Sequence, residues 1–209
     1  VDPGGNVGTE GTSIAVDSNG KAHIAYHSEV PQDLWYATNA SGAWVLEAAE
    51  ATGGGNRIGE LPSIALDSNG KVHIIHYDAS NNNLRYTTNR SGGWVSVEAD
   101  AGGGQDVGSY NGLVLDSDDV AHVCSYNATA NTLEYLTNGS GAWVTTTADA
   151  GGGDDVGGRF GRGTDGEAIV FADAGFEFVG GHAWFEVNFD ATLFENLFGE
   201  RLILSEMEP

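Results

Sequence analysis

Apolar and turn-forming residues alternate along this chain in a pattern that occurs three times. Residues 63–78 read SIALDSNGKVHIIHYD, in which two apolar runs flank the segment DSNG at 67–70. Asn-Gly between two apolar runs predicts a β-hairpin, because both residues tolerate a positive φ angle. The stretch occurs upstream as SIAVDSNGKAHIAYHS at 13–28 and downstream, less well preserved, as GLVLDSDDVAHVCSYN at 112–127. The pattern therefore predicts a protein made of repeated hairpins.

The repeat is longer than the hairpin, with a period near 50 residues. Three kinds of residue keep phase through all copies: the Asp before the turn, a His six residues later, and a Trp near the end of the copy. The steps between copies are 50 and 49 residues, at Asp17, Asp67 and Asp116, at His23, His73 and His122, and at Trp44, Trp94 and Trp143. A fixed period of this length indicates a repeat architecture.

Each copy contains four short strand-like runs, which in the second copy are 64–66, 72–77, 84–88 and 94–98. Four short strands in about 50 residues correspond to one blade of a β-propeller. The sequence therefore predicts an all-β fold, a β-propeller of four-stranded blades at about 12–52, 62–101 and 111–150. A stacked β-solenoid of hairpins is the alternative, although solenoid coils are usually about half as long.

The repeats divide the chain into two parts. Residues 1–163 hold the three repeats, and we expect residues 164–209 to form a divergent fourth blade, a cap or an assembly segment. Closed propellers usually have about four to eight blades. Closure is therefore expected to need either this C-terminal segment as a blade or a second chain, which would make a homo-oligomer or a larger assembly.

The motif order carries a family resemblance. The stretch SIALDSNGKVHIIHYD, followed by NLRYTTN, GGW and a glycine-rich loop, resembles the β-propeller repeats of secreted microbial proteins, relatives of the Asp-box and lectin-type propellers. The resemblance covers residues 1 to about 163. It departs from the Asp box S-x-D-x-G-x-T-W at 88–94, where TNRSGGW is one residue shorter and lacks the Asp. The resemblance implies an extracellular or cell-surface protein that binds sugars between blades, with an aromatic ring stacked on the sugar.

Composition narrows the choice of partners. The chain of 209 residues has 30 acidic against 8 basic residues, a net charge of −22. This charge argues against nucleic acid and anionic membranes as partners, since both are bound by basic patches. No apolar run approaches the roughly 18 residues of a membrane-spanning helix, so we expect no membrane insertion. The single cysteine, Cys124, cannot form an internal disulfide and is expected to be a buried thiol.

The recurring histidines are expected to be structural, hydrogen-bonded across blades, with a metal site as the alternative. His27 and His76 do not keep the repeat phase, which weakens any case for them. The segment DSNG also resembles the start of a calcium loop, but the third acidic ligand and the Glu at position twelve do not follow. We therefore expect no cofactor, with Ca²⁺ kept as an alternative.

Aromatic residues recur in the third strand-like run of each copy, and carboxylates recur in the glycine-rich loops. Both suit sugar recognition between blades, although the tyrosines could equally pack the core. Trp35 is the exception, because its repeat equivalents are Arg85 and Glu134, so we expect it to be exposed. The candidate ligand-binding residues are Trp35, Tyr36, Arg85, Tyr86, Tyr135, Asp106, Asp154 and Asp155.

The sequence thus favours an extracellular recognition or adhesion module that binds a glycan or a cell-surface polymer. A structural surface or assembly protein, contacting its partner through the C-terminal segment, is the second hypothesis. A glycan-active propeller enzyme is the third. The chain has no GxSxG, HExxH or Walker motif, and three similar repeats do not single out one reaction centre, so we expect no catalytic residue.

Overall fold

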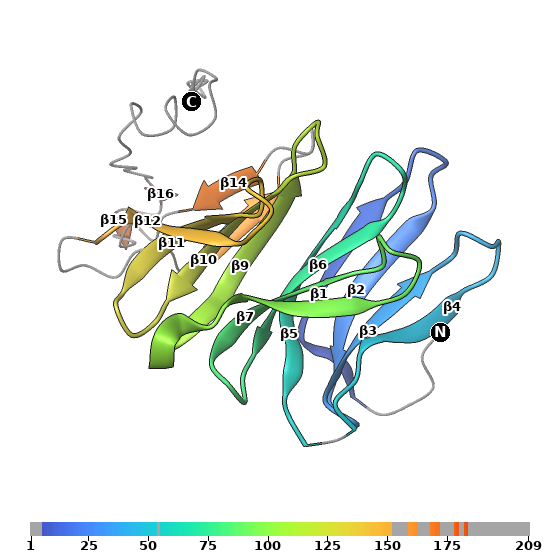
Figure 1. Ribbon diagram of the computed structural model, residues 1–209, viewed down its shortest axis with the longest axis horizontal. Coiled ribbons are helices and arrows are strands. Elements are labelled where there is room, and N and C mark those ends of the chain that lie inside the picture. Colours follow the sequence, from blue (N-terminus) through green and yellow to red (C-terminus); the bar gives the residue numbers. More distant parts are fainter. Residues whose placement is uncertain are drawn as a thin grey trace. The chain divides into compact units, whose positions relative to one another are not determined.

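The computed structural model describes residues 6–53 and 55–151, together with the backbone of four short strands near the C-terminus (Figure 1). These four are β13 (Arg159–Arg162), β14 (Ala168–Phe171), β15 (Phe178–Val179) and β16 (His182–Ala183). All regular structure in this part of the chain is β, apart from one 3-10 turn at Gly102–Gly104. The described residues contain no helix that is long and apolar enough to span a membrane.

Three four-stranded antiparallel sheets follow one another along the chain, and within each the strands are neighbours in sequence order. Sheet 1 contains β1 (Val7–Val16), β2 (Ala22–Ser28), β3 (Asp33–Thr38) and β4 (Val45–Glu50). Sheet 2 contains β5 (Ile58–Leu66), β6 (Val72–Asp78), β7 (Asn83–Thr88) and β8 (Val95–Asp100). Sheet 3 contains β9 (Val107–Leu115), β10 (Ala121–Asn127), β11 (Thr132–Thr137) and β12 (Val144–Asp149). The predicted all-β fold, with three four-stranded units of about 50 residues, is confirmed.

The hairpin turns form where the sequence predicted them, but of the Asn-Gly pair only the glycine has a positive φ angle. In sheet 2 the Asp67 carboxylate accepts the N–H groups of Asn69 at 2.9 Å and Lys71 at 2.8 Å. Gly70 adopts a φ of 72° and donates its N–H to the Asp67 carbonyl. The side chain of Asp67 therefore holds a turn that the glycine makes sterically possible.

The first strand of each sheet is longer than predicted. β5 begins at Ile58, within the segment that the sequence assigned to a glycine-rich loop, and Ile58 pairs with Asp78. Two register shifts separate this pairing from the regular part of the ladder. Gly59 and Leu61 have φ angles of 85° and 48°, so the chain passes through conformations that simple strand patterns do not anticipate.

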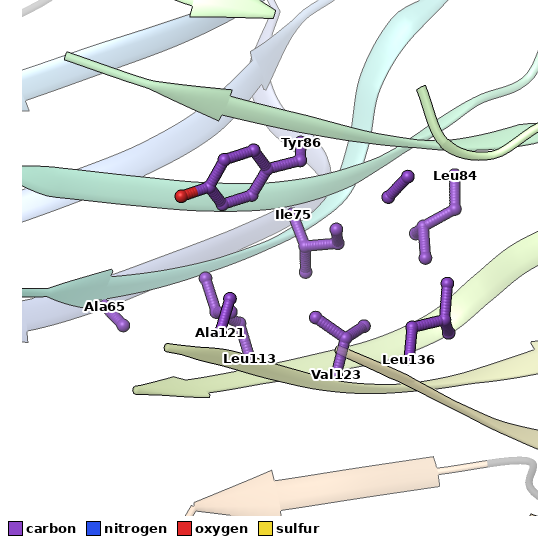
Figure 2. Close-up of a cluster of buried hydrophobic side chains, with 9 residues drawn as sticks. Ala65, Ile75, Leu84, Tyr86, Leu113, Ala121, Val123 and Leu136 are labelled. Carbon is purple, nitrogen blue, oxygen red and sulfur yellow. The ribbon is translucent and has the colours of Figure 1, made fainter. Parts of the chain in front are cut away.

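Two apolar clusters form the core, one on each face of sheet 2. Val72 and Ile74 belong to the cluster shared with sheet 1, whereas Ile75 and Leu84 belong to the cluster shared with sheet 3. Figure 2 shows the second cluster, in which Ile75 and Leu84 lie opposite Val123. Burial on both faces explains why the strands of sheet 2 lack a regular alternation of apolar and polar residues.

Close packing between sheets depends on glycine at one repeat position. A Cβ on Gly59 would lie 2.7 Å from Cα of Leu34 in sheet 1. The equivalent Gly108 would place a Cβ 2.8 Å from that of Leu84 in sheet 2. β5 and β9 therefore each approach the preceding sheet so closely that a Cβ at these glycines would clash with it.

The compact unit that holds the three sheets runs to Asp173, and residues 174–209 form a second unit. Within the first unit, β13 pairs antiparallel with β14. Most of the segment that was expected to form a fourth blade, a cap or an assembly segment lies outside the described residues, so that expectation stays a prediction.

Candidate functional site

The recurring histidines each bond a tyrosine of their own sheet, and in sheets 2 and 3 they also bond the repeated Asp. In sheet 3, His122 Nε2 lies 3.1 Å from the Asp116 carboxylate, and Nδ1 lies 2.6 Å from the Tyr135 hydroxyl. In sheet 2, His73 Nδ1 likewise bonds the Tyr86 hydroxyl. The partners lie in the same sheet, so the prediction of hydrogen bonds across blades is wrong. In each case the imidazole bonds a tyrosine on the adjacent strand of its own sheet.

The tyrosines of sheets 1 and 2 make the contact between sheets instead. Tyr36 of sheet 1 packs edge-on against Trp94 of sheet 2, with ring centroids 5.3 Å apart. Tyr86 of sheet 2 packs in the same way against Trp143 of sheet 3, at 5.1 Å. Edge-to-face contacts of this kind add to the burial that stabilises a core. The Asp–His–Tyr sets thus orient core aromatics.

The structure does not bring the predicted ligand-binding residues together. Tyr36 and Tyr86 are buried, with 4% and 8% of their surface exposed, and Tyr135 is half-buried against His122. These rings occupy the core position that the sequence left open as their alternative. Trp35 is half-buried, rather than exposed as expected.

The polar candidates are distributed in the same way. Arg85 forms an ion pair with Glu50 at 2.5 Å, and Asp106 accepts a hydrogen bond from the Tyr77 hydroxyl at 2.8 Å. Asp154 and Asp155 lie outside the described residues. Within that part of the chain, no group of three or more His, Cys, Asp or Glu side chains could hold a metal ion. The candidate cofactor Ca²⁺ therefore gains no support there.

An open cleft of about 320 Å³ lies where sheet 1 meets the start of sheet 2. It is lined by His27, Glu29, Val30, Gln32 and Arg57, and we call it the first cleft. His27 comes from the end of β2, the next three follow in the β2–β3 loop, and Arg57 directly precedes β5. The N–H of Ile58 donates to the carbonyl of Gln32 at 3.2 Å, which ties the two walls together.

His27 is the most unusual residue of the first cleft. Only 1% of its surface is exposed, and neither ring nitrogen has a hydrogen-bond partner among the described residues. Burial, followed by the positive charge of Arg57, lowers the pKa of His27 below its ordinary value. The neutral imidazole therefore carries one donor and one acceptor that the protein leaves unused.

Carboxylates on both sides of the cleft hold its polar groups in place. Arg57 lies 2.6 Å from the Glu60 carboxylate and 3.5 Å from that of Glu10. Glu29 accepts hydrogen bonds from Asn6 at 2.7 Å and Thr9 at 2.9 Å, and these bonds lower its pKa. Glu29 is thus an oriented, ionised acceptor, and Arg57 an oriented donor.

The equivalent position between sheets 2 and 3 is closed by internal hydrogen bonds. There Tyr77 replaces His27 and Asp106 replaces Arg57, 50 and 49 residues further along the chain. The Tyr77 hydroxyl bonds both Asp106 and the side chain of Asn82, at 2.8 and 3.0 Å. The polar side chains at this position between sheets 2 and 3 therefore satisfy one another. Those of the first cleft stay available.

The residues that mark the first cleft in the sequence are ones that depart from the repeat. His27 does not keep the repeat phase, and no arginine occupies the position of Arg57 in the other repeats. Both departures from the repeat coincide at one junction between sheets, which only the packing of the sheets reveals.

No protein-family model matches the chain, and no curated protein matches it. Among solved structures, the chain is similar to a fucose lectin from Kordia zhangzhouensis in complex with methyl-fucoside. The TM-score is 0.44 and the sequence identity 17%, and the match covers 65% of this chain and 97% of the lectin chain. A likeness of this size carries no argument about ligand or mechanism, so both rest on the contacts described above.

Proposed function

We propose that this chain is a β-propeller module that binds carbohydrate in the first cleft. The arrangement of the sheets supports a propeller. Each sheet packs face to face on the next, and the first strands β1, β5 and β9 lie against one another in turn. First strands gathered side by side, with the last strands outermost, are the arrangement that blades adopt around a central axis.

The side chains of the first cleft suit a ligand with several hydroxyl groups. A sugar hydroxyl both donates and accepts hydrogen bonds, so it pairs with the Glu29 carboxylate as donor and with the Arg57 guanidinium as acceptor. Gln32 can do either. Val30, which is 74% exposed, offers an apolar surface for the C–H face of a sugar ring. The volume of about 320 Å³ lies at the small end of the roughly 300–1,000 Å³ of small-molecule sites.

The observation that carries the proposal is the buried, unpartnered imidazole of His27. Leaving buried polar atoms without partners costs roughly 1–3 kcal/mol, and few buried polar groups of native proteins are left so. Between sheets 2 and 3 the equivalent position is Tyr77, whose hydroxyl is satisfied. A bound hydroxyl that reaches the imidazole would supply the missing partner.

An extracellular or cell-surface recognition and adhesion role, with a glycan or a cell-surface polymer as partner, is part of the same proposal. Its support is the chemistry of the cleft together with the acidic chain. A net charge of −22 favours neutral or cationic ligands over polyanionic ones.

The test is a glycan array of the purified chain, with calcium and with chelator, followed by titration of the sugars that bind. Methyl-fucoside belongs among the titrated sugars as a defined monosaccharide probe. Binding is expected to weaken by at least about tenfold in Gln32→Ala, a loss of about 1.4 kcal/mol. His27→Tyr introduces the residue type found at the equivalent position 77 and is expected to abolish sugar binding.

Asn82→Ala is the matched control, because Asn82 holds the repeat position of Gln32 and also has a positive φ angle, 55° against 74°. It should bind as the wild type does. A folded wild-type protein that binds no sugar would refute the proposal. So would a loss of binding in Asn82→Ala equal to that in Gln32→Ala.

A further inference from the structure

The charges around the first cleft do not balance. Both signs of charge act on the His27 imidazole, and the side chains concerned are Arg57, Glu10, Glu29 and Asp33. Arg57 is also paired with two carboxylates, Glu60 at 2.6 Å and Glu10 at 3.5 Å. In the part of the chain that the structure describes, one guanidinium thus stands among four carboxylates, and the cleft has a negative charge.

Glu29 is the carboxylate of this group that a ligand can reach as an ionic partner. It lines the cleft, and it takes part in no ion pair with another described residue. Asn6 and Thr9 each donate a hydrogen bond to one of its oxygens, and each oxygen can accept another. Asp33, by contrast, is 2% exposed and accepts the N–H of Thr52 at 2.9 Å. Glu29 is therefore an oriented carboxylate that lacks a cation.

The two carboxylates at positions 29 and 33 belong to the first repeat alone. Their equivalents, 50 and 49 residues further along the chain, are uncharged: Ala79 and Asn83, then Ala128 and Thr132. Sheets 2 and 3 form without these carboxylates, so building a sheet does not require them. The negative charge of the first cleft is a property of this junction and not of the repeat.

The buried imidazole of His27 is a second, independent feature of the same cleft. Both ring nitrogens lack a hydrogen-bond partner among the described residues, although only 1% of the residue is exposed. A neutral imidazole accepts one hydrogen bond and donates one. An ammonium group is a donor only, with three protons, so it can bond both the imidazole nitrogen and the Glu29 carboxylate. A hydroxyl next to it can accept the N–H of the other ring nitrogen.

We propose that the first cleft prefers an amino sugar, whose protonated amine pairs with Glu29 and donates to His27, over the neutral sugar with a hydroxyl in its place. This inference rests on the proposed function, because it names the class of carbohydrate for the same site. The remaining ring hydroxyls bond Gln32 and Arg57. A cleft with charges of one sign concentrates ligands of the opposite sign, which acts in the same direction.

The experiment is isothermal titration calorimetry of the full chain at pH 7 with the methyl glycosides of glucosamine, galactosamine and mannosamine. Each is compared with the parent methyl hexoside, which carries a hydroxyl in place of the amine. An exposed ion pair contributes up to about a fivefold gain in affinity. At least one amino sugar should therefore bind about fivefold more tightly than its parent.

Two variants remove the charge of Glu29. Glu29→Gln keeps the size of the side chain and should lower the preference for the amine to less than about twofold. Glu29→Ala introduces the residue type that the other repeats carry at this position, and it should have the same effect. Glu47→Gln is the matched control, because it removes the same charge from an exposed position on β4, and it should leave the preference unchanged.

Three results would overturn this inference and leave the proposed function standing. The first is binding of the parent sugars as tightly as the amino sugars. The second is a preference that survives both variants of Glu29, or one that Glu47→Gln reduces equally, since it would then reflect the charge of the whole chain. The third is competition by methylammonium chloride at the concentrations at which the amino sugar binds, which would show a site for ammonium alone. If neither neutral nor amino sugars bind, the proposed function itself fails.

Discussion

Glu50 joins sheets 1 and 2 through an ionic contact that can be removed with one substitution. It is the last residue of β4, and its side chain is 12% exposed. One carboxylate oxygen lies 2.5 Å from the Arg85 guanidinium, and the other lies 3.2 Å from His76 Nε2. Glu50→Gln keeps the shape of the side chain and removes its charge. We expect this variant to destabilise the packing of the two sheets.

The magnitude follows from the pKa of Glu50. Burial raises this pKa, but the hydrogen bonds from His76 and Arg85 outweigh burial and bring it from 4.5 to about 2. A difference of about 2.5 between the unfolded and the folded chain corresponds to about 3 kcal/mol of stability at pH 7. Breaking a buried ion pair from one side costs about 3–5 kcal/mol, which agrees.

The pH dependence gives the prediction its sign. A carboxylate with a lowered folded pKa contributes stability that is complete above its unfolded pKa of 4.5 and is lost as the pH falls toward 2. The free-energy difference between wild type and Glu50→Gln should therefore shrink from about 3 kcal/mol at pH 7 to about 1 kcal/mol at pH 3.

Urea unfolding, followed by tryptophan fluorescence at both pH values, measures this difference. Glu47→Gln is the control, because Glu47 lies on the same strand but is exposed, and it should change stability by no more than about 0.5 kcal/mol. A loss below about 1 kcal/mol for Glu50→Gln at pH 7 would refute the reasoning, as would a loss that is equal at pH 7 and pH 3.

Other changes test the packing and the buried histidines. Gly59→Ala should cost about 3 kcal/mol in urea unfolding, since alanine is strained at its φ of 85° and its Cβ would meet neighbouring backbone, whereas Gly93→Ala, in open space, should cost under about 1 kcal/mol. Trp94→Ala should cost about 3 kcal/mol, and a cost below about 1 kcal/mol would contradict its role between sheets. Burial lowers the pKa of His27 and His73 below 6.5, so the unfolded chain binds more protons below that pH. Stability should therefore rise between about pH 5 and pH 7, and a flat urea midpoint over that range would argue against neutral buried histidines.

The sheets were predictable because the interactions that define them are local in sequence. The carboxylate of Asp67 bonds N–H groups two and four residues away, and Gly70 supplies the positive φ angle three residues on. Turns of this kind can be read from four residues, and the period then gives the number and order of the strands. The early start of β5 could not be read, because it depends on how Gly59 approaches Leu34 of another sheet.

The first cleft was missed because its residues are brought together by packing. His27 and Arg57 are 30 positions apart, and neither recurs in the other repeats. The predicted site residues came largely from positions that repeat, such as Tyr36 and Tyr86, and these tyrosines pack the core. The predicted Asp106 holds the repeat position of Arg57. It lies between sheets 2 and 3, however, where it already accepts a hydrogen bond from Tyr77.

In this chain, the residues that recur are those that build the sheets. The repeated His and Tyr bond each other in all three sheets, and the repeated Asp joins them in sheets 2 and 3. The repeated Asn closes a turn, as where Asn89 accepts the N–H of Val72 at 2.8 Å. Most recurring polar groups are therefore directed to a partner within their own repeat, although Nε2 of His23 has none among the described residues. Polar atoms free to meet another molecule then come mainly from positions that differ between repeats. Such differences gather at the first cleft, where His27 and Arg57 have no equivalent in the other repeats, so in this repeat protein the candidate site lies where the repeats differ.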